Sequence, residues 1–189
     1  VTGIRTKRNI DFSDEPALAM LHLEDTKTNI REDLLTDVAV LAIGHSARDT
    51  FGLLNLSDIK MEPKPFAVGV RVEHPQDMID ESQYGKNAPE SLPAAAYKLT
   101  AKTKEGRGVY TFCMCPGGYV VNASSEENRL AVNGMSYSGR NGKNANSAVI
   151  VTVSPEDFPE KGILGGLAFQ RQLEEAAFAE GQGKIPVQL

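Results

Sequence analysis

The sequence predicts an α+β fold, in which an antiparallel β-rich domain with a few helices follows a partial β-meander and a strand–turn–helix. Short segments that alternate apolar and polar residues, joined by turns rich in Gly, Asn and Ser, follow residue 65 and predict the antiparallel sheet. A stiff connector at residues 61–65 (MEPKP) precedes them, because each proline favours extended backbone before it. We therefore place the domain boundary between residues 60 and 61.

Residues 1–60 contain short apolar segments separated by polar ones. We expect a loop over residues 5–16 and strands over residues 1–4, 17–23 and 30–35. Residues 37–43 (DVAVLAI) form a nearly continuous apolar run, typical of a strand buried on both faces of a parallel sheet. Gly44 ends the run, Ser46 offers an N-cap, and a helix should extend to about Leu56. A strand followed by a helix N-terminus is where open α/β sheets bind ligands.

The later part of the chain begins with an alternating segment, in which Val68, Val70 and Val72 share one face and Arg71 and Glu73 the other. Further short strands and two helices are expected after it. The expected strands cover residues 66–73, 97–103, 109–115, 119–123, 130–137 and 148–153, with a short helix over residues 75–79, a final helix around residues 169–178 and a last apolar run at residues 185–189 that indicates a strand cut short.

Composition excludes several classes of protein. The chain of 189 residues carries a net charge of -5 and a pI near 5.3, which argues against nucleic-acid binding because such proteins usually present a basic patch. No apolar run approaches the roughly 20 residues that span a membrane. The 2 cysteines cannot form the disulfide framework of a secreted domain, so we expect a cytoplasmic protein. The missing initiator Met hints at a fragment.

Cys113 and Cys115 are the first candidates for chemistry. On a regular strand, residues two apart share a face, so both sulfurs should point the same way. Three explanations remain open: small buried side chains, a redox role, or a soft-metal site. A metal site needs about four ligands, and no second cysteine pair accompanies this one. We therefore expect both cysteines to be reduced and free of metal.

Two glycine-containing turns are candidate ligand sites. Pro116, Gly117 and Gly118 follow the cysteine strand, and glycines there allow either a plain tight turn or a close approach to a planar ligand. Gly44 and His45 close the apolar run, where a structural role and a ligand contact are both open. Residues 139–147 (GRNGKNANS) are expected to be a polar loop, solvated or facing an acidic substrate.

Several long strings resemble a family of uncharacterised bacterial FAD-dependent dehydrogenases, also described as NAD/FAD-utilising flavoproteins. They match in order and rough spacing across nearly the whole chain. The strings are residues 40–51 (VLAIGHSARDTF), 63–76 (PKPFAVGVRVEHPQ), 108–126 (GVYTFCMCPGGYVVNASSE), 132–148 (VNGMSYSGRNGKNANSA) and 169–178 (FQRQLEEAAF).

The resemblance implies that residues 1–60 are part of an FAD-binding domain and that residues 61–189 are an inserted substrate-side domain, truncated at its C-terminus. It implies FAD as the cofactor, with Gly44 and His45 beside it. Cys115, Pro116, Gly117 and Gly118 would face the flavin ring. The resemblance identifies no catalytic residue.

Two functional hypotheses follow. The chain is either part of an FAD-dependent oxidoreductase, inactive alone because the family's glycine-rich fingerprint lies outside it, or a non-catalytic β-domain that binds a ligand or partner. The first implies a small-molecule substrate and NAD(P)H or another electron donor. Neither implies a nucleic-acid or membrane partner.

Overall fold

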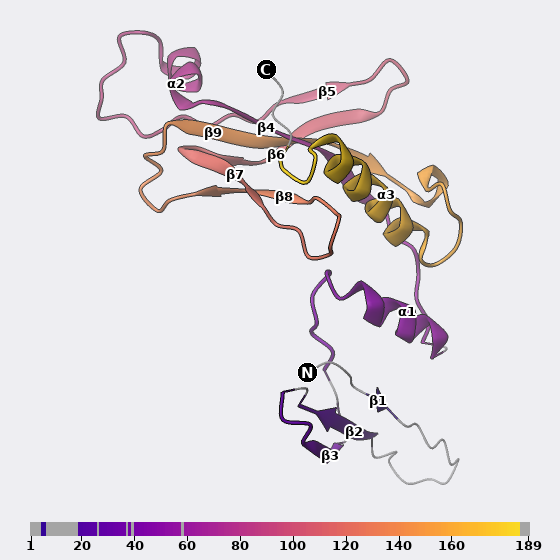
Figure 1. Cartoon of the computed structure of the whole chain (residues 1–189). Helices are drawn as coiled ribbons and strands as arrows, with labels where there is room; N and C mark the ends of the chain where they lie inside the picture. The colour runs from indigo at the N-terminus through magenta and orange to yellow at the C-terminus, as the bar shows by residue number, and fades with distance from the viewer. Residues whose placement is uncertain are drawn as a thin grey trace. The chain divides into compact units, whose positions relative to one another are not determined.

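The computed structural model describes residues 5–6, 19–25, 27–36, 38, 40–57 and 59–185 and divides the chain into two compact units, Val1–His45 and Ser46–Leu189 (Figure 1). Antiparallel sheets and helices occur together, which confirms the predicted α+β class. Helix α1 (Arg48–Leu56), which we expected within the first domain, belongs to the second unit, where Arg48 pairs with Glu174. Because compact units need not coincide with functional domains, the division at residues 60 and 61 stays a prediction.

The first unit contains a small antiparallel sheet in the order β1-β2-β3. Its strands are β1 (Arg5–Thr6), β2 (Ala19–Glu24) and β3 (Arg31–Thr36), close to two of the expected strands. The carboxylate of Asp25 closes the β2–β3 turn by accepting hydrogen bonds from the Lys27 amide at 2.9 Å and the Thr28 hydroxyl at 2.8 Å. Asn29 takes φ +55° there, a conformation that asparagine tolerates in turns. The strand expected at residues 1–4 lies outside the described residues, as does all but the first residue of the strand expected at residues 185–189; Ile185 itself belongs to no strand.

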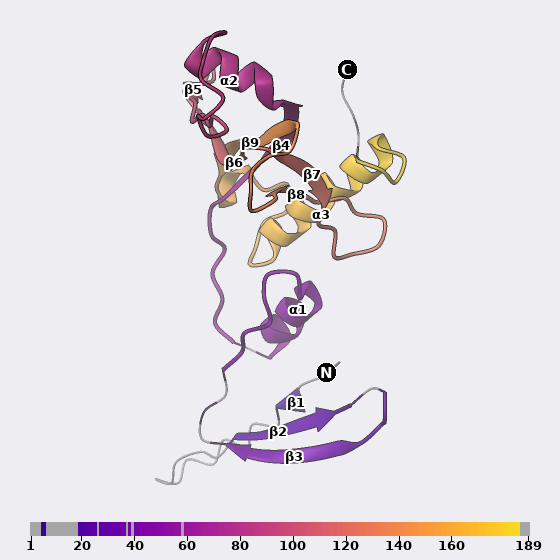
Figure 2. The same cartoon turned by 90° about the vertical axis from the view of Figure 1, so that its left-hand side faces the viewer.

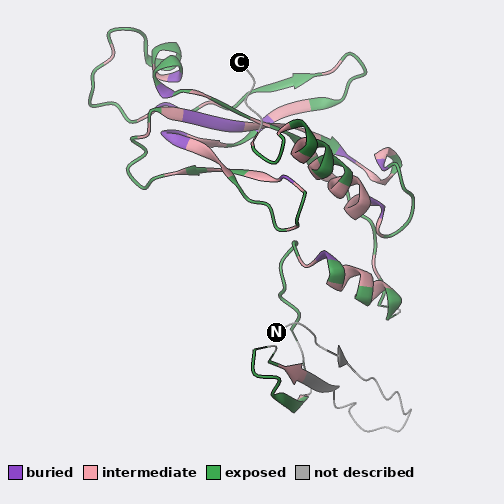
Figure 3. Ribbon diagram, viewed as in Figure 1, coloured by how far each residue is buried: buried purple, intermediate pink, exposed green. Residues whose placement is uncertain are grey.

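The apolar run after β3 differs from its prediction. Among residues 38 and 40–43, none belongs to a strand, and Figure 3 colours the ribbon that leads into α1 mostly as exposed. Val38 and Val40 are 74% and 86% exposed. The expected buried strand is therefore wrong for these described residues. A strand is stable only when a neighbour accepts and donates its backbone hydrogen bonds, and the described residues supply no such neighbour.

The second unit begins with α1, whose N-cap also differs from the expectation. The N-cap is Ala47 rather than Ser46, and no side chain caps the helix. Residues 59–65, which precede the main sheet, belong to no helix or strand. Within the described part of the chain, no helix combines the length and the apolar character that crossing a membrane requires.

The main sheet of the second unit is antiparallel, in the order β4-β9-β6-β5. Strand β4 pairs with β9 without interruption from Phe66↔Val153 to Pro75↔Asn144. β4 is therefore a strand, as predicted, but Val70 and Val72 of its apolar face are exposed and Arg71 of the other face is half-buried. Strand β9 begins earlier than expected, inside the segment expected to be a polar loop. The strands are β4 (Phe66–Pro75), β5 (Thr100–Lys102), β6 (Gly108–Cys115) and β9 (Asn144–Val153).

A bulge interrupts β6 beside the cysteines. Phe112 pairs with Ala148 and Cys115 with Asn146, so β6 carries one more residue than β9 across this interval. Cys113 takes φ +46° within the bulge, a region that favours glycine. The extra residue breaks the alternation on which a shared face for both sulfurs depended. Cys115 now lies on the face of Asn146, and Cys113 is exposed.

A hairpin of β7 (Gly118–Asn122) and β8 (Val132–Ser136) packs against that same face of the sheet, and Figures 1 and 2 both show it beside the sheet. Gly134 lies so close to Arg71 and Asn146 that a Cβ atom there would overlap both side chains. The backbone amide of Val120 donates to Glu73 at 2.6 Å. Asn146 is therefore enclosed between two layers of strands, whereas Glu73 on the same face stays exposed.

Helices cover other parts of the sheet. Helix α2 (Gln76–Tyr84) follows β4 directly and is longer than expected, whereas α3 (Gly165–Glu180) begins before the expected helix. The ring of Phe66 packs against Phe158, which follows the short helix η1 (Pro155–Asp157), and against Phe169 of α3, with centroid distances of 5.3 and 6.4 Å. The best-buried apolar residues are Ile79, Ala95, Leu130, Ala145, Val153 and Phe158.

Candidate functional site

Gly44 and His45 lie in an exposed turn at the end of the first unit. Gly44 takes φ +74°, and a Cβ atom added there would meet nothing within 4 Å. The glycine is therefore needed for the turn's conformation rather than for space around it. The open surroundings and the exposed His45 are compatible with the predicted approach of a cofactor to this turn.

The turn at Cys115, Pro116, Gly117 and Gly118 lies in the second unit and is enclosed by protein. Pro116, Gly117 and Gly118 are all buried, and Cys115 is half-buried. Gly117 takes φ +56°, and a Cβ atom there would overlap the backbone carbonyl of Arg140. This packing supplies a structural reason for glycine at position 117.

Gln76 holds the turn from the other side. Its side-chain oxygen accepts a hydrogen bond from the Gly117 amide at 2.8 Å, and its amide group donates to Asp80 at 2.7 Å and to the carbonyl of Ala95 at 3.0 Å. Ser136 donates to the carbonyl of Pro116 at 2.7 Å. Because Gln76 is itself 4% exposed, these bonds are shielded from water and fix the turn firmly.

The two predicted flavin-contacting segments thus fit FAD unequally. The turn at Gly44 and His45 presents free surface, whereas Pro116, Gly117 and Gly118 present little in the described part of the chain. Contact of these three residues with a flavin stays a prediction. Cys115, the first residue of the turn, is the one that is partly exposed.

Arg71 lies beside the cysteines. Its guanidinium donates to Asn146 Oδ1 at 2.6 Å and to the carbonyl of Cys113 at 3.1 Å, and it lies 4.0 Å from the sulfur of Cys115. Asn146 is fully buried, and its Nδ2 has no hydrogen-bond partner among the described residues. Across those residues no group of three or more His, Cys, Asp or Glu side chains is placed to hold a metal ion.

His74 has a hydrogen-bond partner from a distant part of the chain. Its Nε2 lies 2.8 Å from the hydroxyl of Tyr97, which belongs to the loop between α2 and β5. Burial raises the pKa of Tyr97 above its ordinary value. The pair fastens that loop to the edge strand β4.

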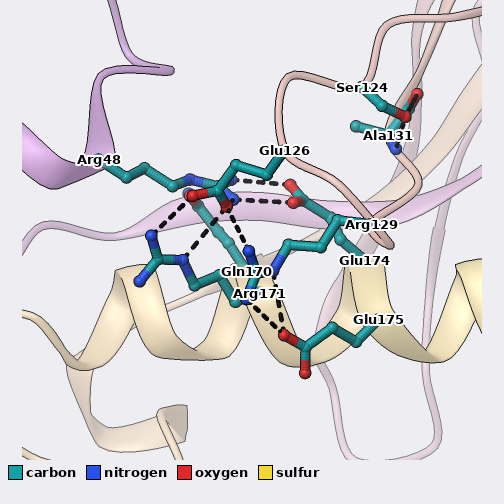
Figure 4. Close-up of polar contacts among 9 residues, drawn as sticks. All are labelled: Arg48, Ser124, Glu126, Arg129, Ala131, Gln170, Arg171, Glu174 and Glu175. Atoms are coloured by element: carbon teal, nitrogen blue, oxygen red, sulfur yellow. Dashed lines mark hydrogen bonds and ion pairs between the residues drawn. The ribbon is translucent and has the colours of Figure 1, made fainter.

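The most strongly built polar cluster is centred on Arg48 at the start of α1 (Figure 4). Arg48 is only 7% exposed. Its guanidinium forms a bidentate pair with Glu174 at 2.7 and 2.8 Å, and it also donates to Glu126 at 2.9 Å and to Gln170 at 3.1 Å. The carboxylates raise the pKa of Arg48 above its ordinary value, Glu174 most strongly. The oxygens around its two terminal nitrogens offset the cost of burying this charge, while the Nε atom of Arg48 is buried without a partner among the described residues.

Glu126 links Arg48 to two further arginines. It accepts from Arg171 at 2.7 Å and lies 3.3 Å from Arg129, which also pairs with Glu175 at 2.7 Å. The hydrogen bonds from Arg171 first, and then from Arg48, lower the pKa of Glu126 to about 2. The loop that carries Glu126 is closed by backbone and side-chain bonds between Ser124 and Ala131. We call these six ionic residues, together with Gln170, the Arg48 cluster.

The Arg48 cluster was not predicted from the sequence. A signal was nevertheless present, because Arg48, Glu126 and Glu174 each lie within one of the strings that carry the family resemblance. The fold brings these distant strings together through ionic side chains. The matching string that contains Gly44, residues 40–51, therefore also contains Arg48, which connects α1 to α3.

The fold and the site define an α+β protein with a two-layered β domain, preceded by a small sheet and an open glycine turn. The chain belongs to the family described as FAD-dependent protein, C-terminal domain-like, whose model matches residues 65–189. It is also 53% identical over 162 residues to an uncharacterized protein of Clostridium beijerinckii. That match covers 84% of this chain and 30% of the relative, so the chain spans about a third of the relative's length.

Proposed function

We propose that this chain is part of a longer FAD-dependent oxidoreductase, in which the second unit forms the substrate side and the Gly44 turn contributes to the flavin site. The observation that carries the proposal is the family match over residues 65–189. The length of the relative supports it, because a protein nearly three times as long has room for a complete dinucleotide-binding domain.

In such an enzyme the flavin would carry the redox chemistry, and the chain would supply binding, orientation and exclusion of water. A small-molecule substrate and NAD(P)H or another electron donor complete the proposed reaction. The open turn at Gly44 and His45 is the feature of the described residues that best suits a cofactor contact.

The test compares two proteins. The isolated chain of 189 residues should bind FAD weakly or not at all, because the glycine-rich turn that holds a pyrophosphate at a helix N-terminus is absent from its sequence. The longer polypeptide that includes it should purify with bound flavin, seen as the absorption bands of an oxidised flavin. Micromolar saturable FAD binding by the isolated chain, or a longer polypeptide without flavin, would contradict the proposal.

A further inference from the structure

The guanidinium group of Arg71 is held by the protein through one nitrogen. Its Nη1 donates to Asn146 Oδ1 at 2.6 Å and to the carbonyl of Cys113 at 3.1 Å, and it lies 4.0 Å from the sulfur of Cys115. A Cβ atom at Gly134 would overlap the same nitrogen. Strands β4, β6, β8 and β9 thus meet around Nη1 and fix the position and orientation of the group.

The opposite edge of this guanidinium, formed by Nε and Nη2, is free. Neither atom has a hydrogen-bond partner among the described residues. The buried nitrogens that lack a partner in the described part of the chain are Arg48 Nε, His74 Nδ1 and Asn146 Nδ2. Nε and Nη2 of the half-buried Arg71 therefore remain in contact with solvent.

Two other arginines show what this edge binds within the same protein. Arg129 donates from Nε and Nη2 to Glu175 at 3.0 and 2.7 Å. Arg171 donates from the same two atoms to Glu126 at 3.2 and 2.7 Å. The parallel N–H groups of this edge match the geometry of a carboxylate. Arg71 presents the same edge with no carboxylate from the described residues in front of it.

Glu73, the acidic residue of β4, does not fill this place. One of its carboxylate oxygens accepts from the Val120 amide at 2.6 Å, and the other accepts from the side-chain amide of Asn144 at 2.6 Å. Partial burial of a charged group without a paired anion costs free energy. An anion in front of Nε and Nη2 of Arg71 offsets that cost.

Asn146 leaves a second donor unused at the same place. It is fully buried, its Oδ1 is taken by Arg71, and its Nδ2 has no partner among the described residues. Since both atoms belong to one amide group, the spare donor lies beside the guanidinium, and Asn146 is also the cross-strand neighbour of Cys115. Unsatisfied buried donors and residues with strained backbone, here Cys113 with φ +46°, concentrate at ligand sites.

We propose that Arg71 binds the carboxylate group of a small-molecule substrate, in a site that the half-buried sulfur of Cys115 borders. Nε and Nη2 donate to the two carboxylate oxygens, while Asn146 holds the guanidinium in place through Nη1. Calling the ligand a substrate rests on the proposed function, whereas carboxylate binding is a property of the chain itself.

The first experiment adds malonate to the isotope-labelled chain and follows the Nε–H resonances of its arginines by nitrogen–proton correlation NMR. The Arg71 resonance should shift and saturate. The resonances of Arg129 and Arg171 should stay in place, because a glutamate already occupies the same edge of each. Sodium chloride at equal ionic strength should reproduce none of the Arg71 shift.

The second experiment compares Arg71→Lys, which keeps the charge and loses the fork, with Arg140→Lys at an exposed arginine of the loop before β9. Arg71→Lys should weaken malonate binding about tenfold in calorimetric titration, because an ammonium group cannot form the bidentate pair. Arg140→Lys should leave the affinity unchanged. The wild-type NMR titration decides the proposal even where Arg71→Lys fails to fold.

The third experiment uses the longer polypeptide with its flavin. Malonate should change the absorption spectrum of the bound flavin, because a substrate that the flavin oxidises or reduces must lie against it. Arg71→Lys in the longer polypeptide should keep the flavin content and lose the response to malonate.

Each contrary result overturns a defined part of the proposal. An unshifted Arg71 resonance, or an equal shift in sodium chloride, overturns carboxylate binding, and tighter binding of inorganic phosphate overturns the class of ligand. Malonate binding by the chain but not by the longer polypeptide assigns the place to a carboxylate of that polypeptide and overturns the small-molecule ligand. A flavin spectrum that bound malonate leaves unchanged overturns the substrate role alone. A longer polypeptide without flavin overturns the proposed function and leaves the NMR result standing.

Discussion

Replacing Gly117 by alanine should destabilise the chain far more than the same change at Gly106, and the difference measures how tightly the turn after Cys115 is enclosed. Both glycines have positive φ, +56° and +84°. A Cβ atom at Gly106 meets nothing within 4 Å, whereas one at Gly117 overlaps the backbone carbonyl of Arg140. Comparing Gly106→Ala with Gly117→Ala therefore separates the effect of backbone conformation from the effect of close packing.

The expected magnitudes follow from these two terms. Alanine in the left-handed region costs about 1–2 kcal/mol, of which about 0.4–1 kcal/mol is recovered from the reduced entropy of the unfolded chain. Gly106→Ala should thus lower the free energy of unfolding by about 0.5–1 kcal/mol. At Gly117, overpacking against backbone adds about 1–3 kcal/mol, and weakening the bond to Gln76 adds about 1 kcal/mol. Gly117→Ala should therefore lose about 2–5 kcal/mol.

Equilibrium unfolding in urea measures both changes, provided that the dependence on denaturant stays the same. Gly108→Ala, at a glycine without positive φ and with open surroundings, serves as a neutral reference. If Gly117→Ala were no more destabilising than Gly106→Ala, the turn would be open in solution and free to approach a flavin. If the large difference is found, loss of flavin in a Gly117 variant cannot by itself demonstrate a flavin contact.

Two further predictions concern stability. The pKa of Glu126 in the folded chain, about 2, lies below its ordinary 4.5, so its contribution is complete above pH 4.5 and is lost as the pH falls toward 2. Solvent screens this part-exposed group, so the loss in the free energy of unfolding should be about 2 kcal/mol. The difference between the unfolding free energies of the wild type and Glu126→Gln, measured across this pH range, isolates the contribution of Glu126. Parallel pH profiles for the two proteins would contradict it. At the bulge, Cys113→Gly should be about 0.5–1 kcal/mol more stable than Cys113→Ala in urea unfolding, because φ is +46° there; equal stabilities would refute a strained Cys113.

Alternation of apolar and polar residues located most strands of the second unit, but it failed where polar side chains are buried. Asn144, Asn146 and Ser147 indicated a loop, yet they form the first part of β9. Asn146 accepts a hydrogen bond from Arg71, and the Ser147 hydroxyl donates to the carbonyl of Phe112 at 3.3 Å. Partners from other strands make their burial tolerable, and no local pattern reveals such partners.

The start of α3 was missed for a related reason. Gly165 and Gly166 indicate a helix end by composition, but here they begin the helix. Gly165 lies against the backbone carbonyl of Glu160, and a Cβ atom at Gly166 would lie 3.2 Å from the ring of Phe158. Small residues at this point let α3 approach the rings of Phe66 and Phe158. This requirement depends on the tertiary structure and is invisible in a window of sequence.

The apolar run at residues 37–43 shows how a sound pattern and its structural context can disagree. Its composition suits a strand enclosed on both faces, but Val38, Val40 and Leu41 are exposed. Burial of a side chain of this size is worth about 1.5–3 kcal/mol, so leaving several in water forgoes a large part of a domain's net stability. A sheet that receives this run would recover that energy.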